Sequence, residues 1–190
     1  MFKNTRTITV MAVLIAMSVV LVALIHFPIF PAASFLEYDP ADIPILICAF
    51  AYGPIAGIIV TVIAAGIQAL TVSAGSGIYG FIMHVIATTA LCLPAGIIYK
   101  RNRTRKHALI ALIIGTVLMG AVMVVANHFI TPQFMGAPTE AVDAMLLPVI
   151  LPFNLIKAGI NSVVTFLVYK PISKYVIKAR NESDKLEMAN

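Results

Sequence analysis

The sequence predicts an all-α membrane protein with six transmembrane helices, cytoplasmic N- and C-termini and a short second helix. The prediction comes from the composition, the positions of the basic residues and one helix break. Of the 190 residues, 61% are hydrophobic and 11% are charged, and the mean hydropathy is +0.99. Soluble domains carry about 25% charged residues, and a globule of this length cannot bury so many apolar side chains. The chain therefore needs a lipid environment, with no room for a sizeable soluble catalytic domain.

The basic residues predict the topology. Twelve of the thirteen Lys and Arg residues fall into three clusters, with two at residues 3–6, five at 100–106 and five at 170–185. Cytoplasmic segments of membrane proteins are enriched in Lys and Arg, so all three clusters are expected inside. The number of spans between consecutive clusters must then be even.

A helix break makes the number of spans between the first two basic clusters even. The apolar stretch at 41–72 has 32 residues, about 48 Å as one helix, whereas the hydrocarbon core is about 30 Å thick. Gly53-Pro54 divides it, because proline cannot continue a helix and glycine favours a turn. Six helices are therefore expected at about 8–26, 41–53, 54–72, 78–99, 108–130 and 146–170.

These helices form one predicted domain, residues 1–180. The polar segment 181–190 is expected to be a frayed cytoplasmic tail. A cleaved signal peptide is the alternative for residues 1–33, but its apolar region would be too long and no A-x-A site follows it.

One lysine lies inside an apolar helix. Lys157 shares a helix face with Asn154 and Asn161, since the three are spaced i, i+3 and i+7. A central lysine costs about 2.5–3.5 kcal/mol on insertion scales. An acid, a set of carbonyl groups or a bound ligand must therefore compensate it.

Other polar residues are expected at the same outer level of the bundle. Asn127 lies near the end of the fifth helix, and three acids follow the first helix: Glu37, Asp39 and Asp42. One interpretation is a salt bridge from Lys157 to Glu37 or Asp39, with the amides joining helices. The other is a pocket for a small, polar-edged ligand that enters from outside.

Several other features favour packing or exclude catalysis. Cys48 and Cys92 lie in apolar runs and are expected to be buried packing residues. Gln68 and His84 lie mid-helix, where interhelical hydrogen bonds are expected. The sequence has no Walker A, H-E-x-x-H, G-x-S-x-G or C-x-x-C motif, so neither an enzyme nor a metal site is predicted.

Three stretches resemble a known family. These are Phe35-Leu36-Glu37-Tyr38-Asp39-Pro40-Ala41-Asp42-Ile43-Pro44, Tyr52-Gly53-Pro54, and Pro152-Phe153-Asn154-Leu155-Ile156-Lys157 followed by Asn161-Ser162. They are similar to the substrate-binding S components of energy-coupling factor (ECF) vitamin transporters, most closely the riboflavin-specific members. Ala12 and Ala16 match the motif of that family's first helix.

The resemblance implies a multi-pass protein of the bacterial plasma membrane that captures riboflavin at the outer face. It would then dock on a transmembrane coupling subunit bearing two ATPases and topple to release the vitamin inward. The implied substrate-binding residues are Glu37, Asp39, Asn127, Asn154 and Lys157, and Ala12 and Ala16 would face the coupling subunit. Asp39 and Asp42 either contact the ligand or fix the loop. Riboflavin would be a substrate, and no cofactor is implied.

The chemistry of these residues suits a flavin. The pyrimidine edge of isoalloxazine offers acceptors beside one N–H donor, while asparagine supplies an acceptor and donors and lysine supplies donors. Glu37 is placed to accept from that N–H or from ribityl hydroxyls. Two alternatives stay open: an S component for an acid-bearing vitamin, and a membrane scaffold or enzyme whose polar cluster is structural.

Overall fold

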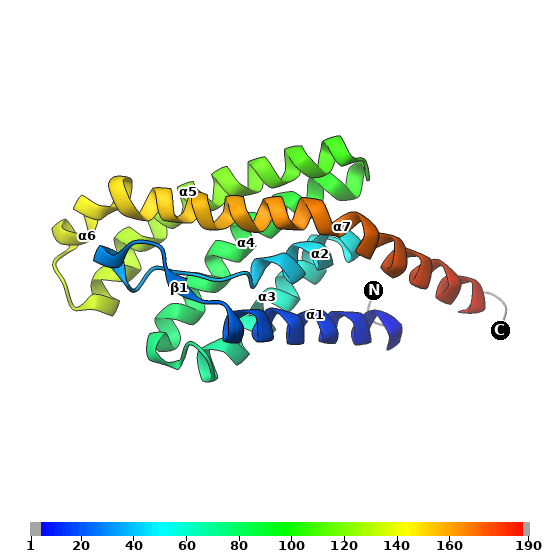
Figure 1. Cartoon of the computed structure of the whole chain (residues 1–190), viewed down its shortest axis with the longest axis horizontal. Helices are drawn as coiled ribbons and strands as arrows, with labels where there is room; N and C mark the ends of the chain where they lie inside the picture. Colours follow the sequence, from blue (N-terminus) through cyan, green and yellow to red (C-terminus); the bar gives the residue numbers. More distant parts are fainter. Residues whose placement is uncertain (1–4, 188–190) are drawn as a thin grey trace.

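The computed structural model describes residues 5–187, which form a bundle of helices (Figure 1). Its α-helices are α1 (Thr5–Leu24), α2 (Asp42–Tyr52), α3 (Pro54–Leu70), α4 (Gly77–Arg101), α5 (Arg105–Met135), α6 (Thr139–Met145) and α7 (Leu151–Glu187). A π-helical turn, Leu146–Ile150, joins α6 to α7, so these form one continuous helical segment. The described chain thus contains the six predicted membrane helices.

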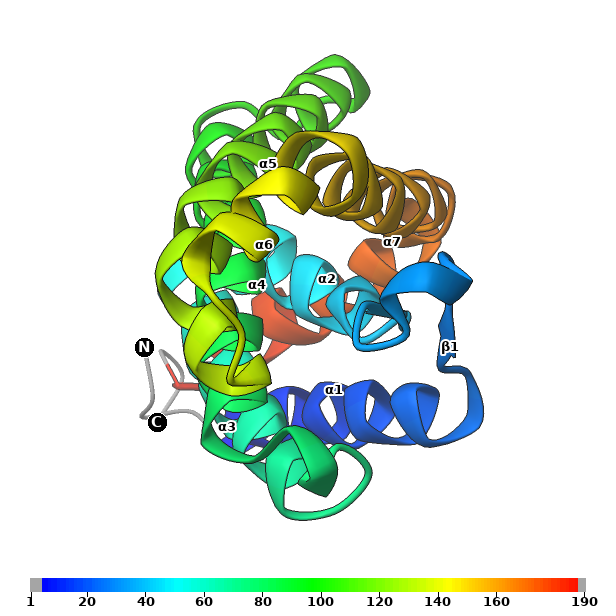
Figure 2. The ribbon, with the colours of Figure 1, turned by 90° about the vertical axis from the view of Figure 1, so that its left-hand side faces the viewer.

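Four of these segments are long and apolar enough to cross a bilayer: α1, residues 74–101, α5 and residues 139–171. Helices α2 and α3 are shorter, with 11 and 17 residues. The prediction of a short second helix is confirmed. Nine of the eleven α2 residues are buried, and α2 is enclosed by α1, α4 and α7 (Figure 2). Because protein surrounds it, α2 needs no full hydrophobic span of its own.

The break between α2 and α3 follows from two adjacent residues. Gly53 has φ +98°, a conformation that other residues rarely adopt, and its N–H donates to the Ala49 carbonyl at 2.9 Å. Pro54 is the first residue of α3, where its missing N–H costs nothing. The chain therefore stops one helix and starts the next without an intervening loop.

The start of α1, the connection between α4 and α5 and the end of α7 lie at one end of the bundle (Figure 1). The basic residues at 100–106 therefore share an end with the C-terminal cluster, as an even number of spans requires. Lys3, of the first cluster, lies outside the described residues. By the positive-inside rule this end is cytoplasmic.

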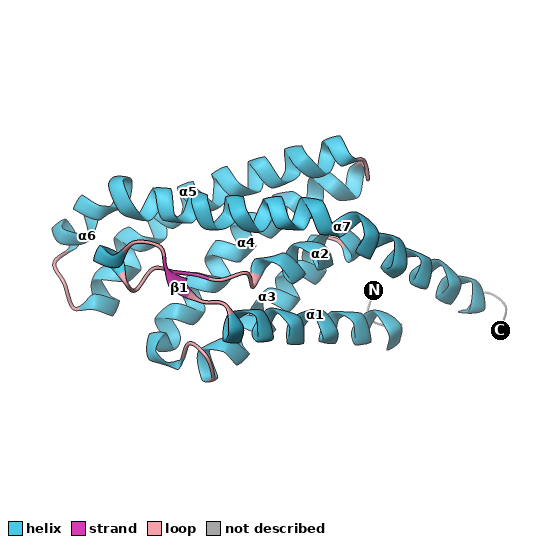
Figure 3. Cartoon of the chain, in the orientation of Figure 1, coloured by secondary structure: helices cyan, strands magenta, loops and turns pink. Residues whose placement is uncertain are grey.

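A small hairpin organises the opposite, outer end. Strands β1 (Phe27–Pro28) and β2 (Glu37–Tyr38) pair antiparallel, with Phe27 opposite Tyr38 (Figure 3). The aromatic rings of this pair lie 5.4 Å apart between centroids. The sequence prediction treated this region as a simple connection, because two-residue strands carry no periodic signal.

Three predicted helix ends were wrong. The last helical segment begins at Thr139, seven residues before the expected 146. Helix α5 continues five residues beyond 130 and ends where Gly136, at φ +61°, donates its N–H to the Pro132 carbonyl. Helix α7 continues to Glu187, so the tail from 181 is helical as far as it is described. Extending an existing helix adds one hydrogen bond per residue, and therefore polar residues can prolong an apolar helix.

Candidate binding site

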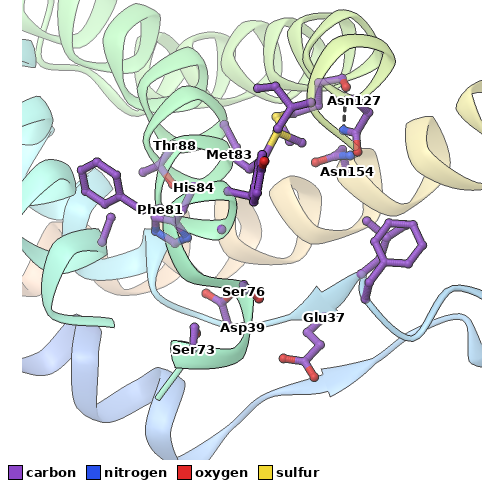
Figure 4. A pocket seen from close by; sticks show the side chains of 18 of the residues that line it. Glu37, Asp39, Ser73, Ser76, Phe81, Met83, His84, Thr88, Asn127 and Asn154 are labelled. Atoms are coloured by element: carbon purple, nitrogen blue, oxygen red, sulfur yellow. Dashed lines mark hydrogen bonds between the residues drawn. The ribbon is translucent and has the colours of Figure 1, made fainter. Parts of the chain in front are cut away.

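A cavity opens between the outer hairpin and the outer halves of α3, α4, α5 and α7 (Figure 4). The space within it and at its open mouth, part of which is solvent, is about 1050 Å³. The structure brings together all five residues predicted to bind substrate, since each lines this cavity: Glu37, Asp39, Asn127, Asn154 and Lys157. Glu37 is exposed, whereas the other four are buried.

Lys157 is paired with an acid. Its Nζ lies 2.6 Å from Asp39 Oδ2, and Asp39 Oδ1 accepts from the Ala41 N–H at 3.0 Å. Burial alone would raise the pKa of the Asp39 carboxyl, but the Lys157 ammonium outweighs it and lowers that pKa below its usual value. The predicted salt bridge therefore forms, with Asp39, and it is also part of the cavity wall.

The ion pair leaves hydrogen-bonding capacity on the lysine. Among the described residues, Asp39 is the one hydrogen-bond partner of Lys157. An ammonium group has three donors, so two remain for a ligand. Asp39 thus both lines the cavity and fixes Lys157 to the hairpin loop.

Asn161 has a different role from its neighbours on the same helix face. It donates to the Asp39 carbonyl at 3.0 Å and to Asp42 Oδ2 at 2.9 Å, and it accepts from the Tyr38 hydroxyl at 3.1 Å. Asp42 also accepts from Thr88 at 2.6 Å. Neither Asn161 nor Asp42 lines the cavity, so this network fixes the loop and the start of α2.

The side-chain amides of Asn127 and Asn154 retain unused hydrogen-bond donors. Nδ2 of Asn127 donates to the Met123 carbonyl at 2.7 Å, and Nδ2 of Asn154 donates to the Ile150 carbonyl at 2.8 Å. Each NH2 group has a second donor. The carbonyl that accepts from Asn154 belongs to Ile150, the last residue of the π turn, and such turns are frequent at functional sites. Both amides are therefore equipped to bind a further polar group.

Apolar side chains complete the cavity. Three of them are methionines, whose flexible thioethers adapt to irregular surfaces and contact aromatic rings favourably. The apolar lining includes Leu36, Met83, Met119, Met123 and Phe153. The cavity wall therefore combines apolar side chains with the polar groups described above.

Sequence reasoning missed part of the lining. Gln68 forms the predicted interhelical bond, donating to Ser18 Oγ at 3.4 Å, but it also lines the cavity. His84 lines the cavity too, and its Nε2 is buried without a hydrogen-bond partner. The prediction that His84 joins helices was therefore wrong. The periodicity of α4 gives no sign of which neighbour faces this position.

The two alanines of α1 lie elsewhere. Ala12 and Ala16 are exposed, whereas Met11, Leu14 and Ser18 on the same helix are buried. The small-residue face is therefore turned away from the rest of the bundle.

Cys48 and Cys92 are buried free thiols, as predicted.

Comparisons with known proteins agree with this architecture. The family model for the substrate-specific component of ECF transporters matches residues 6–169. The riboflavin transporter RibU of Staphylococcus aureus is 32% identical over 182 residues, 93% of this chain and 94% of the relative. The riboflavin transporter FmnP of Bacillus subtilis is 29% identical over 186 residues, 94% of this chain and 97% of the relative.

A solved structure extends the similarity to three dimensions. The S component of a bacterial ECF transporter superposes with a TM-score of 0.78 at 30% identity, covering 90% of this chain and 96% of that structure. The fold prediction is thereby confirmed, and the family is one of transport components that work with a coupling subunit and ATPases. The chain belongs to the substrate-specific S components of ECF transporters, multi-pass bacterial membrane proteins that bind a substrate and are not enzymes.

Proposed function

We propose that this S component binds riboflavin from the outer face and delivers it inward with a coupling subunit and ATPases. The observation that carries the proposal is the composition of the cavity wall. Lys157, Asn127 and Asn154 line the cavity with unused hydrogen-bonding groups, together with apolar side chains that suit a flat ring. The relatives described as riboflavin transporters support the same substrate.

The free groups match the flavin edge. Two N–H donors of Lys157 and one of each asparagine are available for carbonyl and ring-nitrogen acceptors, and Asn154 Oδ1 is available for the ring N–H. Each such bond would satisfy a buried polar group that is otherwise costly to leave unpaired. Glu37, exposed at the mouth, is placed to accept from ligand hydroxyls.

The position of the cavity fits uptake. It lies at the end of the bundle opposite the basic residues of the α4–α5 connection, so the positive-inside rule makes its mouth external. Ala12 and Ala16 present a smooth, exposed face on α1. We assign docking of the coupling subunit to that face.

Purification from riboflavin-fed cells tests the substrate. The protein should carry a yellow, fluorescent ligand, and the flavin-free protein should quench added riboflavin stoichiometrically. A colourless protein that does not quench riboflavin would refute the assignment.

A vitamin bearing a carboxylate is the second candidate, favoured by Lys157. Asp39 already neutralises that lysine at 2.6 Å, so a second carboxylate would meet a paired charge. Competition separates the two candidates, because biotin, as an acid-bearing probe, should fail to displace riboflavin.

A further inference from the structure

One polar atom of the cavity wall has no partner in the protein. Among the described residues, three buried side-chain atoms lack a hydrogen bond: His84 Nε2, Thr89 Oγ1 and Thr165 Oγ1. Of these residues only His84 lines the cavity. An unpaired buried polar group is destabilising, so each one needs an explanation. For His84, the explanation we consider is a ligand in the adjoining cavity.

The charged neighbours of His84 bond other groups and leave Nε2 unpaired. The charged groups that act on it are Asp39, Asp42 and Lys157. Asp39 is held by Lys157 and by the Ala41 N–H, and Asp42 is held by Thr88 and Asn161. Imidazole has one nitrogen that donates and one that accepts when neutral. A partner that both accepts and donates would therefore suit it.

The position of His84 indicates which part of a ligand it meets. In Figure 4, His84 lies in the same region as Asp39, Ser73 and Ser76, apart from Asn127 and Asn154. The His84 region presents hydroxyls and the Asp39 carboxylate, whereas the other region presents amides. Lys157 adjoins both regions, because it bonds Asp39 and shares a helix face with Asn154. Hydroxyls of a ligand donate to carboxylates and exchange hydrogen bonds with serine and histidine.

We infer that His84 is a specificity-determining residue that hydrogen-bonds the polyhydroxyl chain of the flavin, while the two amides hold the ring edge. This inference rests on the proposed riboflavin function. It gives the flavin an orientation in the cavity, with the ribityl chain toward α4 and the serines of the α3–α4 connection. It also explains why the histidine is left unpaired by the protein.

Two flavins and three substitutions test the inference. Lumiflavin has the same ring system as riboflavin but lacks the ribityl chain. His84→Leu and His84→Phe should each weaken riboflavin binding about tenfold and leave lumiflavin binding unchanged, as measured by fluorescence quenching in detergent. His84→Gln, which keeps a donor and an acceptor, should recover part of the riboflavin affinity.

Thr89→Val is the matched control, since it removes an unpaired buried hydroxyl from the same helix outside the cavity. It should change neither affinity. Unchanged riboflavin affinity in both apolar His84 variants, or an equal loss for both flavins, would overturn the role of His84 while leaving the riboflavin function intact. A wild-type protein that binds neither flavin would instead overturn the proposed function, and this inference with it.

Discussion

Two neighbouring groups of polar side chains at the outer end of the bundle differ in how far their hydrogen bonds are satisfied. In the loop-fixing network, Asn161 makes three hydrogen bonds and Asp42 accepts two within the protein. In the cavity wall, Asn154 makes one and His84 Nε2 makes none. Burial alone does not distinguish the groups, since Asn154 and Asn161 are both at most 1% exposed. Unused hydrogen-bonding capacity beside a cavity is what marks a candidate binding residue.

The largest effect is expected at Lys157. Lys157→Ala should weaken riboflavin binding about hundredfold or more, because it removes ligand donors and leaves Asp39 buried without its cation. Fluorescence titration measures the loss. Lys170→Ala removes the same charge from an exposed position of α7 and should leave binding unchanged.

A lone buried carboxylate would also destabilise the fold. The double variant Asp39→Asn with Lys157→Met removes the ion pair without leaving a charge, so it should melt above Lys157→Ala. If the folded double variant binds riboflavin like the wild type, Lys157 has no role in recognition.

The next largest effect is expected at Asn161, and it should be on stability and not on ligand binding. Asn161→Leu breaks three buried hydrogen bonds, one of them to the Asp42 carboxylate, and should lower the free energy of unfolding by about 2–4 kcal/mol. Thermal unfolding in detergent measures it, with the exposed Asn102→Ala as control. A stable Asn161→Leu protein with abolished flavin binding would contradict the division between the two groups.

A smaller effect is expected at the amides of the cavity. Asn154→Ala should weaken riboflavin binding about tenfold with little change in melting temperature, because its main missing contacts are those to the ligand. Gln133→Ala removes an amide with the same backbone bond, one helical turn back, at an exposed site outside the cavity. Equal affinities of the two variants would show that Asn154 does not meet the ligand.

The smallest effect on affinity is expected at the exposed face of α1. Ala12→Trp and Ala16→Trp should leave riboflavin titrations unchanged but abolish uptake into cells or proteoliposomes containing the coupling subunit and ATPases. A bulky side chain would prevent close helix approach there. Val13→Trp, exposed on an adjacent face, serves as the control and should transport normally. Normal uptake by both alanine variants would place the docking surface elsewhere.

The polar residues of the site could be proposed from sequence because a bilayer makes them conspicuous. A lysine in an apolar helix demands a partner, and three residues at helical spacing share a face. Spacing could not separate Asn161 from Asn154, since both lie on that face with Lys157. Their difference arises because the loop before α2 reaches Asn161, a contact across more than a hundred residues.

By itself, the sequence determined that this chain is a membrane protein of six helices, with a break at Gly53-Pro54 and its basic segments on one side. Those features follow from local properties: hydropathy, the missing proline N–H and the distribution of charge. The tertiary structure alone decided that Asp39 pairs with Lys157, that Asn161 serves the loop and that His84 faces the cavity unpaired. Hydrogen-bond saturation depends on which helices and loops meet, and periodicity within one helix carries no information about its neighbours.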